Sequence, residues 1–158
     1  MGTSEEIQLV VFKLEDEEYG VPVQNVQEII RMTEVTKVPK TPKHVSGVIN
    51  RRGDIIPIVD LKQFFELPRS EEDDDTRIIV VEVGNEVLGI VVDHVSEVLR
   101  LSTDAIEPPP RLSERAEAAY FTGIGKQEDR LLMLLDLNKI VPDFELEKMP
   151  SVQESVVS

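Results

Sequence analysis

Apolar and polar residues alternate in short runs along most of this chain. Val10, Phe12 and Leu14 occupy alternate positions, and the runs at 19–24 and 79–83 continue the pattern. Alternate side chains of a strand point to the same face of a sheet, so each run can bury one face. The runs are also short and rich in β-branched residues, which disfavours helices. The pattern therefore predicts a fold built mainly from short β-strands.

Part of this pattern is written twice. Residues 9–31 (LVVFKLEDEEYGVPVQNVQEIIR) align without a gap with residues 78–100 (IIVVEVGNEVLGIVVDHVSEVLR), and 7 of the 23 positions are identical. Residues 47–61 align in the same way with residues 123–137, and both segments end in Asp-Leu. Two similar folding units are therefore expected. Positions that agree between the copies are expected to build the fold, and positions that differ are candidates for function.

Each copy is predicted to supply about five short strands and one short helix. Asp60 and Asp136 immediately precede LKQFFEL and LNKIV, and an aspartate in that position can cap a helix. Five short strands in a flat sheet would leave two exposed edges, and closure into a small barrel removes them. The predicted fold is all-β, with two similar five-stranded barrels packed through a shared aliphatic core.

The expected domain is a single unit with a tail at each end. Its bounds are 7–144, between tails at 1–6 and 145–158, with barrels over about 15–76 and 77–142. The first strand, 8–14, could pack either with the first barrel or with the second. The acidic run 71–75 lies between the copies and is either a solvated linker or a contact for a metal ion or a partner.

Composition narrows the classes of function. The net charge of −14 disfavours nucleic acid and anionic membrane surfaces, both of which attract clustered Lys and Arg. The chain has no Cys, which excludes disulfides and thiolate chemistry. The start MGTSEEIQ does not read as a signal peptide, and no apolar run reaches the ~18 residues of a membrane span. A cytosolic protein without direct membrane insertion is expected.

The sequence offers little that resembles an enzyme. The repeated Asp60 and Asp136 could form a carboxylate pair, but neither lies in the Asp-Ser/Thr-Gly loop of an aspartic protease, and helix capping explains both. His44 and His94 have no partners at a metal-binding or triad spacing. Gly123-Ile124-Gly125 lacks the third glycine of a phosphate loop. We therefore expect no enzyme, no metal and no cofactor, and keep the Asp60/Asp136 pair as a remote alternative.

The copies differ most at the tip of their second hairpin. The first copy reads Asn50-Arg51-Arg52-Gly53 and the second reads Lys126-Gln127-Glu128-Asp129. Gly53 is expected to supply a positive φ. The change is either drift in an exposed turn or a guanidinium held on a rigid turn, where it can make bidentate contacts to a partner's carboxylates.

Four segments in order, VFKLEDEEYGVPVQNVQEII, GVINRRGDIIPIVDL, GIVVDHVSEVL and YFTGIG, resemble the CheW family of bacterial chemotaxis coupling proteins, over about residues 8–142. The resemblance implies a cytosolic, non-catalytic adaptor with two Src-homology-3-like barrels and no cofactor. The implied partners are the histidine kinase CheA, through its regulatory domain, and the cytoplasmic tips of methyl-accepting receptors, in arrays at the inner face of the membrane. An excised CheW-like regulatory domain of the kinase is the alternative.

The resemblance also implies partner-binding residues. They are Val26, Glu28, Ile29, Asn50, Arg52, Gly53, Gly89 and Val98. Arg52 matches the arginine of the family's N-x-R-G turn. Val26 and Glu28 recur as Val95 and Glu97, so the duplication also allows these two a structural role.

Overall fold

The computed structural model describes residues 5–68, 72–108 and 120–140. Short strands dominate them. The strands are β1 (Glu6–Leu14), β2 (Glu17–Pro22), β3 (Val26–Arg31), β4 (Val45–Arg51), β5 (Asp54–Asp60), β6 (Arg77–Val83), β7 (Glu86–Val92), β8 (His94–Ser102), β9 (Ile106–Glu107), β10 (Phe121–Gln127) and β11 (Arg130–Leu135). The α-helices are α1 (Leu61–Phe64) and α2 (Leu137–Ile140), and single 3₁₀ turns lie at Val23–Asn25 and Thr103–Ala105.

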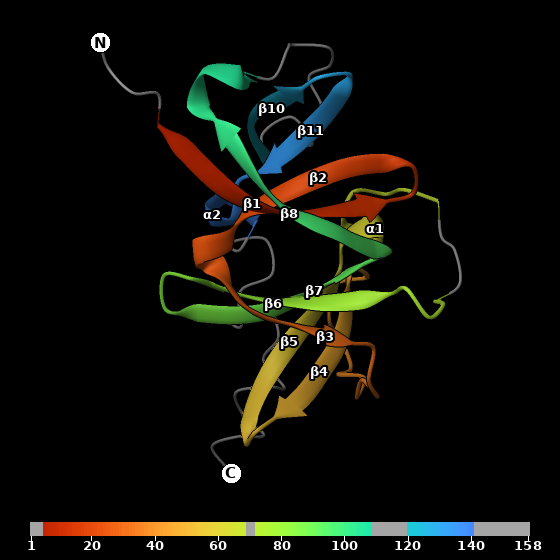
Figure 1. Ribbon diagram of the computed structural model, residues 1–158. Helices are drawn as coiled ribbons and strands as arrows, with labels where there is room; N and C mark the ends of the chain where they lie inside the picture. Colours follow the sequence, from red (N-terminus) through yellow and green to blue (C-terminus); the bar gives the residue numbers. More distant parts are fainter. Residues whose placement is uncertain (1–4, 69–71, 109–119, 141–158) are drawn as a thin grey trace.

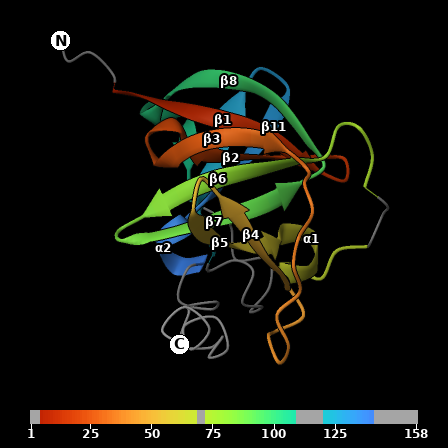
Figure 2. The same ribbon diagram turned by 90° about the horizontal axis from the view of Figure 1, so that it is seen from below.

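The strands form two sheets. Sheet A has the order β8-β1-β2-β11-β10-β9, and sheet B has the order β3-β6-β7-β5-β4. Figures 1 and 2 show α1 and α2 on opposite sides of the molecule, at the level where the sheets meet. The predicted all-β fold with two similar barrel-like halves is confirmed. Sheet A has one strand more than the expected five, the two-residue β9.

Most of the repeated segments form the same elements in both copies. At an offset of 76, β4 and β10 match residue for residue, as do α1 and α2. The short pairings also recur. Thr36 bridges to Val48 in one half, and Glu107 pairs with Ile124, the residue equivalent to Val48, in the other. At Gly47 and Gly123 a Cβ would lie 2.1 Å and 2.7 Å from the carbonyl oxygens of Thr36 and Glu107. Both repeated glycines are therefore required by a close approach of backbone.

The expected barrel boundaries do not match the sheets. Hairpin β1–β2 of the first copy lies in sheet A with β8 to β11, and hairpin β6–β7 of the second copy lies in sheet B with β3 to β5. A division at residue 76 is therefore corrected to a reciprocal exchange of hairpins. Strand β1 pairs with both β2 and β8. Residue alternation predicts that a hairpin buries one face, but it does not specify which sheet receives that hairpin.

Each exchanged hairpin joins its sheet through an antiparallel pairing on one side and a parallel pairing on the other. Strand β2 pairs with β11, placing Gly20 opposite Leu134, and β7 pairs with β5, placing Gly89 opposite Ile58. All other neighbouring strands are antiparallel. The two repeated glycines therefore lie at the joints where one copy meets the other.

The largest group of buried residues belongs to both sheets. It contains Phe12 and Val21 of sheet A together with Val59, Ile79 and Ile90 of sheet B, so the shared core is confirmed. Two smaller aliphatic groups lie one in each half. The core is not purely aliphatic, because the aromatic rings of the described residues lie in it or pack against it. The ring contacts are Phe12–Tyr19, Tyr19–Phe65, Tyr19–Phe121, Phe65–Phe121, Phe64–Phe65, Phe64–Tyr120, Phe65–Tyr120 and His44–Phe64.

The helices and the linker agree with the predictions made from the sequence. Asp60 Oδ1 accepts hydrogen bonds from the backbone N–H groups of Lys62 and Gln63, and Asp136 Oδ1 accepts one from Asn138. Both predicted caps are confirmed.

Residues 72–75 are exposed between the copies. The predicted tail at 145–158, residues 1–4 of the first tail and Glu71 lie outside the described residues. In the described part of the chain, no helix has the length and apolarity needed to cross a membrane.

Candidate partner-binding surface

The turn between β4 and β5 holds three of the predicted site residues. Arg52 and Gly53 form a two-residue hairpin turn with φ values of 54° and 88°, which confirms the positive φ expected at Gly53. Positive φ at both central residues is the geometry that matches the twist of a hairpin. Asn50 Oδ1 accepts a hydrogen bond from Gly53 N–H at 3.1 Å. Asn50 and Gly53 therefore fix the turn, and Arg52 projects from it.

The neighbouring Arg51 contacts Glu28 of β3 across the open side of sheet B. Its Nη2 donates to Glu28 Oε1 at 2.7 Å and its Nε donates to Oε2 at 3.2 Å. This bidentate pair lowers the pKa of Glu28, chiefly through the hydrogen bond from Arg51, and Arg52 adds a weaker electrostatic effect in the same direction. Strands β3 and β4 are the two edges of sheet B, so the ion pair joins them. Sequence reasoning treated Arg51 as a variable tip residue and missed this role.

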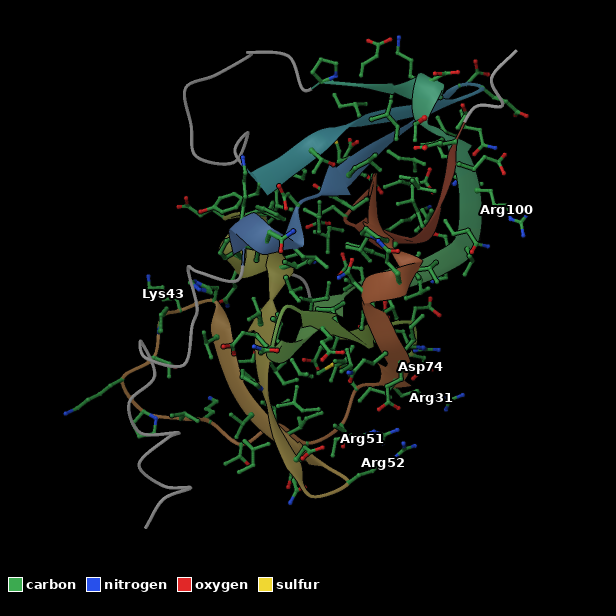
Figure 3. The ribbon with its side chains drawn as sticks, turned by 90° about the vertical axis from the view of Figure 1, so that its left-hand side faces the viewer. Arg31, Lys43, Arg51, Arg52, Asp74 and Arg100 are labelled. Carbon is green, nitrogen blue, oxygen red and sulfur yellow. The ribbon has the colours of Figure 1, made fainter. Side chains whose placement is uncertain are left out.

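A shallow groove connects these side chains. Its lining includes Glu28, Arg51, Arg52 and Ile55, together with Asn85 of the β6–β7 turn and Glu86 at the start of β7. Figure 3 shows Arg51 and Arg52 at the far end of the hairpin, with Arg31 nearby. Arg31 and Arg51 also line a second hollow, formed by residues at the ends of β3 and β4. A cluster of three arginines stands out on a chain with a net charge of −14.

The remaining predicted site residues lie apart from this groove. Ile29 is on β3 with 40% of its surface exposed, and Val98 is on β8 of sheet A with 58% exposed. Val26 is half-buried and packs against the shared core. Gly89 is buried in β7. The structure therefore brings Glu28, Arg52 and their turn together but separates them from Gly89 and Val98.

The second half builds a comparable ion pair from a different position. Arg130 of β11 donates from Nε and Nη2 to Glu18 at 3.0 Å and 2.9 Å, and its Nη2 lies 2.7 Å from Glu97. The hydrogen bond from Arg130 lowers the pKa of Glu18. Glu28 and Glu97 are equivalent by sequence, and each binds an arginine of the second hairpin of its own half. Their recurrence thus has a structural reason, as the duplication allowed.

Exposed aliphatic residues also occur in equivalent pairs. Among the described residues, the exposed large hydrophobics are Ile29, Ile55, Val98 and Leu131. Ile29 and Val98 are related by the offset of 69, and Ile55 and Leu131 by the offset of 76. Each half therefore presents one exposed aliphatic residue on the strand that follows its first hairpin in the sequence, β3 or β8, and one beside the tip of its second hairpin. Ile55 and Leu131 were missed by sequence reasoning, although their alternation with the buried Ile56 and Leu132 signals an outward direction.

The other candidate chemistry has structural explanations. Asp60 and Asp136 each bind the backbone N–H groups at the start of their own helix. His44 packs edge-on against Phe64. In residues 5–68, 72–108 and 120–140, no three His, Asp or Glu side chains are grouped so that they could hold a metal ion.

Comparison with known proteins gives one consistent family. A model of the CheW-like domain matches residues 8–145. The chemotaxis protein CheW of Klebsiella aerogenes is 38% identical over 148 residues, covering 94% of this chain and 89% of that protein. The chemotaxis protein CheW of Helicobacter pylori is 37% identical, covering 87% and 82%.

A solved structure agrees with the fold. The crystal structure of the scaffolding protein TtCheW from Thermoanaerobacter tengcongensis superimposes with a TM-score of 0.78 at 36% identity. The match covers 85% of this chain and 87% of that one. Sequence and structure therefore point to the same relatives over nearly the whole chain.

Proposed function

Because this chain belongs to the CheW family of chemotaxis scaffold proteins, we propose that it couples methyl-accepting chemotaxis receptors to the histidine kinase CheA. The proposal includes contacts with the receptors' cytoplasmic tips and with the regulatory domain of CheA, at the inner face of the membrane. The chain acts by binding and carries out no reaction of its own.

The observation that best supports an adaptor is the pair of equivalent surfaces. A linker between two proteins needs two faces, and each half of this chain exposes aliphatic residues at equivalent positions, Ile29 and Ile55 in one and Val98 and Leu131 in the other. An interface of ordinary size buries about 800 Å² on each partner. Isolated exposed aliphatics are common on any surface, but their recurrence at matched positions of both halves favours use in binding.

The first half adds a feature that the second half lacks. Arg52 is exposed and has no ion-pair partner among the described residues, whereas the equivalent residue of the second half is Glu128. An arginine fixed on a rigid turn loses little freedom when it binds a carboxylate with two hydrogen bonds. We expect an acidic side chain of one partner to contact Arg52, with an apolar neighbour contacting Ile55.

Holding a receptor and a kinase on one scaffold raises the concentration of each in the vicinity of the other. Transmission of a signal further requires that the contacts differ between the two states of the receptor, since only differential binding shifts an equilibrium. The scaffold would then control kinase activity through the complexes it joins.

Arg52→Ala tests the proposal directly. Receptor signalling tips displayed on vesicles are sedimented with purified CheA, with and without this chain. We expect the wild-type chain to bring CheA into the pellet at micromolar concentration. The variant should bind one of the two partners about tenfold or more weakly, the loss expected for a charged hydrogen-bonded contact.

Glu128→Ala is the matched control, because Glu128 occupies the equivalent turn position with a φ of 55°. Both substitutions put alanine into the same backbone conformation, so both should change the melting temperature equally. If the wild-type chain sediments with neither partner, the adaptor function is wrong. If Glu128→Ala weakens binding as much as Arg52→Ala, Arg52 has no special role.

A further inference from the structure

The duplication allows each site to be compared with its counterpart in the other half. In the first half, Lys62 of α1 is buried, with 7% of its side chain exposed. Its Nζ lies 3.2 Å from Asp93, at the junction between β7 and β8, and 3.6 Å from Glu15 in the β1–β2 turn. The aliphatic part of Lys62 is thus enclosed between the halves, and its ammonium group is neutralised by carboxylates.

The counterpart in the second half has lost these groups. By the sequence offsets, Asn138 takes the position of Lys62, Gln24 that of Asp93, and Gly84 that of Glu15. Asn138 and Gln24 are both exposed. Both line a pocket formed by residues of β1, β2 and β11 and by the start of helix α2. A short exposed side chain therefore lines this pocket at the position where the other half has a long buried one.

Packing around the repeated glycines supports the same comparison. A Cβ on Gly89 would lie only 2.7 Å from Ile58 and 2.8 Å from Ile78, so the first half is filled there. A Cβ on Gly20, which lines the pocket, would lie 3.4 Å from both Leu134 and Leu9, an ordinary contact distance. The joint between the copies is therefore looser on the pocket side.

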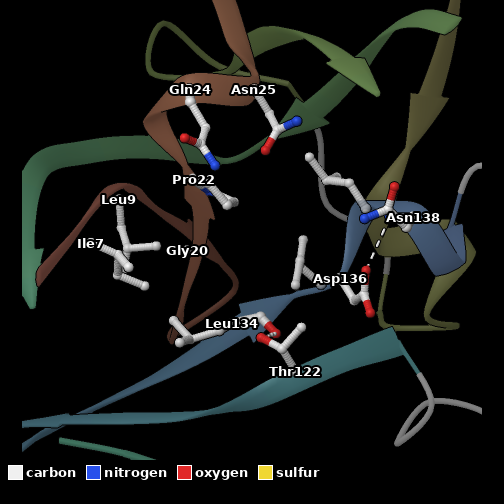
Figure 4. Close-up of a pocket in the computed structure, with 12 residues that line it drawn as sticks. Ile7, Leu9, Gly20, Pro22, Gln24, Asn25, Thr122, Leu134, Asp136 and Asn138 are labelled. Carbon is white, nitrogen blue, oxygen red and sulfur yellow. Dashed lines mark hydrogen bonds between the residues drawn. The ribbon is translucent and has the colours of Figure 1, made fainter. Parts of the chain in front are cut away.

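One wall of the pocket is apolar and includes Ile7, Leu9 and Leu134. The other side carries polar side chains, among them Gln24, Asn25 and Asn138 (Figure 4). Asn25 donates its Nδ2 to the carbonyl oxygen of Glu82 at 2.9 Å, and its Oδ1 is directed toward the pocket.

A carboxylate completes the polar side. Asp136 uses Oδ1 to accept from Asn138 N–H, and its carboxylate is the one charged group among the residues that line the pocket. None of the residues that line the pocket is Lys, Arg or His. The pocket therefore combines one negative charge and side-chain amide groups with an apolar wall.

We propose that this pocket binds a primary alkylammonium group, such as a lysine side chain presented by another protein. The methylene groups would lie on the wall formed by Ile7, Leu9 and Leu134. The ammonium group would donate hydrogen bonds to Asp136 and Asn25, in the way that Lys62 donates to Asp93 in the other half.

The test is an NMR titration of the ¹⁵N-labelled full chain with Nα-acetyl-lysine N-methylamide. We expect saturable shifts in the amide signals of Gln24, Asn25, Thr122 and Asn138. The norleucine analogue, which has an aliphatic side chain without the ammonium group, should bind at least about tenfold more weakly. Pentylamine serves as a free amine. Equal binding of pentylamine assigns recognition to the alkylammonium group alone, and weaker binding assigns it to a lysine within a peptide.

Two variants provide the controls. Asn138→Lys supplies an internal lysine at the position equivalent to Lys62, so it should abolish the shifts and raise the melting temperature. Asn138→Met supplies a side chain of similar length without the charge. It should reduce the amide shifts less than Asn138→Lys does. The proposal is overturned if the norleucine analogue binds as well as the lysine probe. It is equally overturned if the shifts spread over the acidic surface and persist in Asn138→Lys, because a chain of net charge −14 attracts amines without a site.

Discussion

Gly20 and Gly89 are equivalent residues that differ in what surrounds them. Both lie where an exchanged hairpin joins its new sheet in parallel pairing. Gly89 is enclosed by Ile58 and Ile78, whereas Gly20 has ordinary contact distances to Leu9 and Leu134. A role for Gly89 in direct partner contact, as the family resemblance implies, competes with this packing role. Adding a single methyl group, by the substitution Gly89→Ala, distinguishes the packing role from the partner-contact role.

Gly89→Ala should destabilise the chain by about 1–3 kcal/mol, the usual cost of forcing an extra group into a filled core. Gly20→Ala is its control and should change stability by less than about 0.5 kcal/mol. Urea denaturation measures both. If Gly89→Ala leaves the denaturation midpoint unchanged but weakens partner binding, Gly89 belongs to the binding surface instead of the core.

At the scale of the elements, Arg130 links the exchanged hairpin β1–β2 to the rest of sheet A through ion pairs. This arginine connects Glu18 of β2 with Glu97 of β8, so it joins three strands that are far apart in sequence. In sheet B, the position equivalent to Glu18 is Val87 and that equivalent to Arg130 is Asp54, and the arginine–glutamate pair there is Arg51–Glu28. The two halves therefore reach similar closures with different residues.

Arg130→Met should lower the free energy of unfolding at neutral pH by about 1–2 kcal/mol, through loss of hydrogen bonds between charged groups. The pKa of Glu18 is lowered in the folded chain, so its contribution is complete above the ordinary pKa of 4.5 and is lost as the pH falls through the lower folded value. The difference between the wild type and the variant should therefore be largest at neutral pH and should shrink near about pH 3. Urea denaturation at both pH values measures it.

Arg100→Met is the control, since Arg100 is an exposed arginine of β8 whose loss removes the same charge. It should show little pH-dependent difference from the wild type. A deficit in Arg130→Met that stays constant as Glu18 is protonated would mean that the arginine acts through packing of its side chain and not through its charge.

At the scale of the whole molecule, the reciprocal exchange makes the halves dependent on each other. Sheet A lacks two of its strands without the first copy, and sheet B lacks two without the second. The largest core group is also built from both sheets. Because neither copy can complete a barrel from its own strands, the two are expected to fold together.

Cleavage in the exposed linker tests this dependence. Fragments 1–71 and 72–158 should each be largely unfolded alone by circular dichroism, since unpaired sheet edges and half a core do not support a stable domain. An equimolar mixture should regain the β-sheet spectrum and a single thermal transition. Independent folding of either fragment would contradict the exchange, because it would require each copy to form a barrel from its own hairpins.

The sequence by itself determined the local structure of this protein. Alternation specified the strands, and the repeat specified that they occur in two equivalent sets. The aspartates at 60 and 136 specified the starts of both helices. These features depend on interactions between residues that are near in the chain, such as a side chain capping the next turn. The turn at Arg52 and Gly53 was predictable for the same reason.

Only the tertiary structure decided which hairpin completes which sheet, and with it the pairing of Arg51 with Glu28 and of Arg130 with Glu18. An aliphatic hairpin face is equally well buried against either sheet, so its pattern holds no information about its destination. The choice depends on packing between segments far apart in sequence, such as Ile58 and Ile78 around Gly89. Distant contacts also bury Lys62 beside Asp93 in one half and place Asn138 at a pocket in the other.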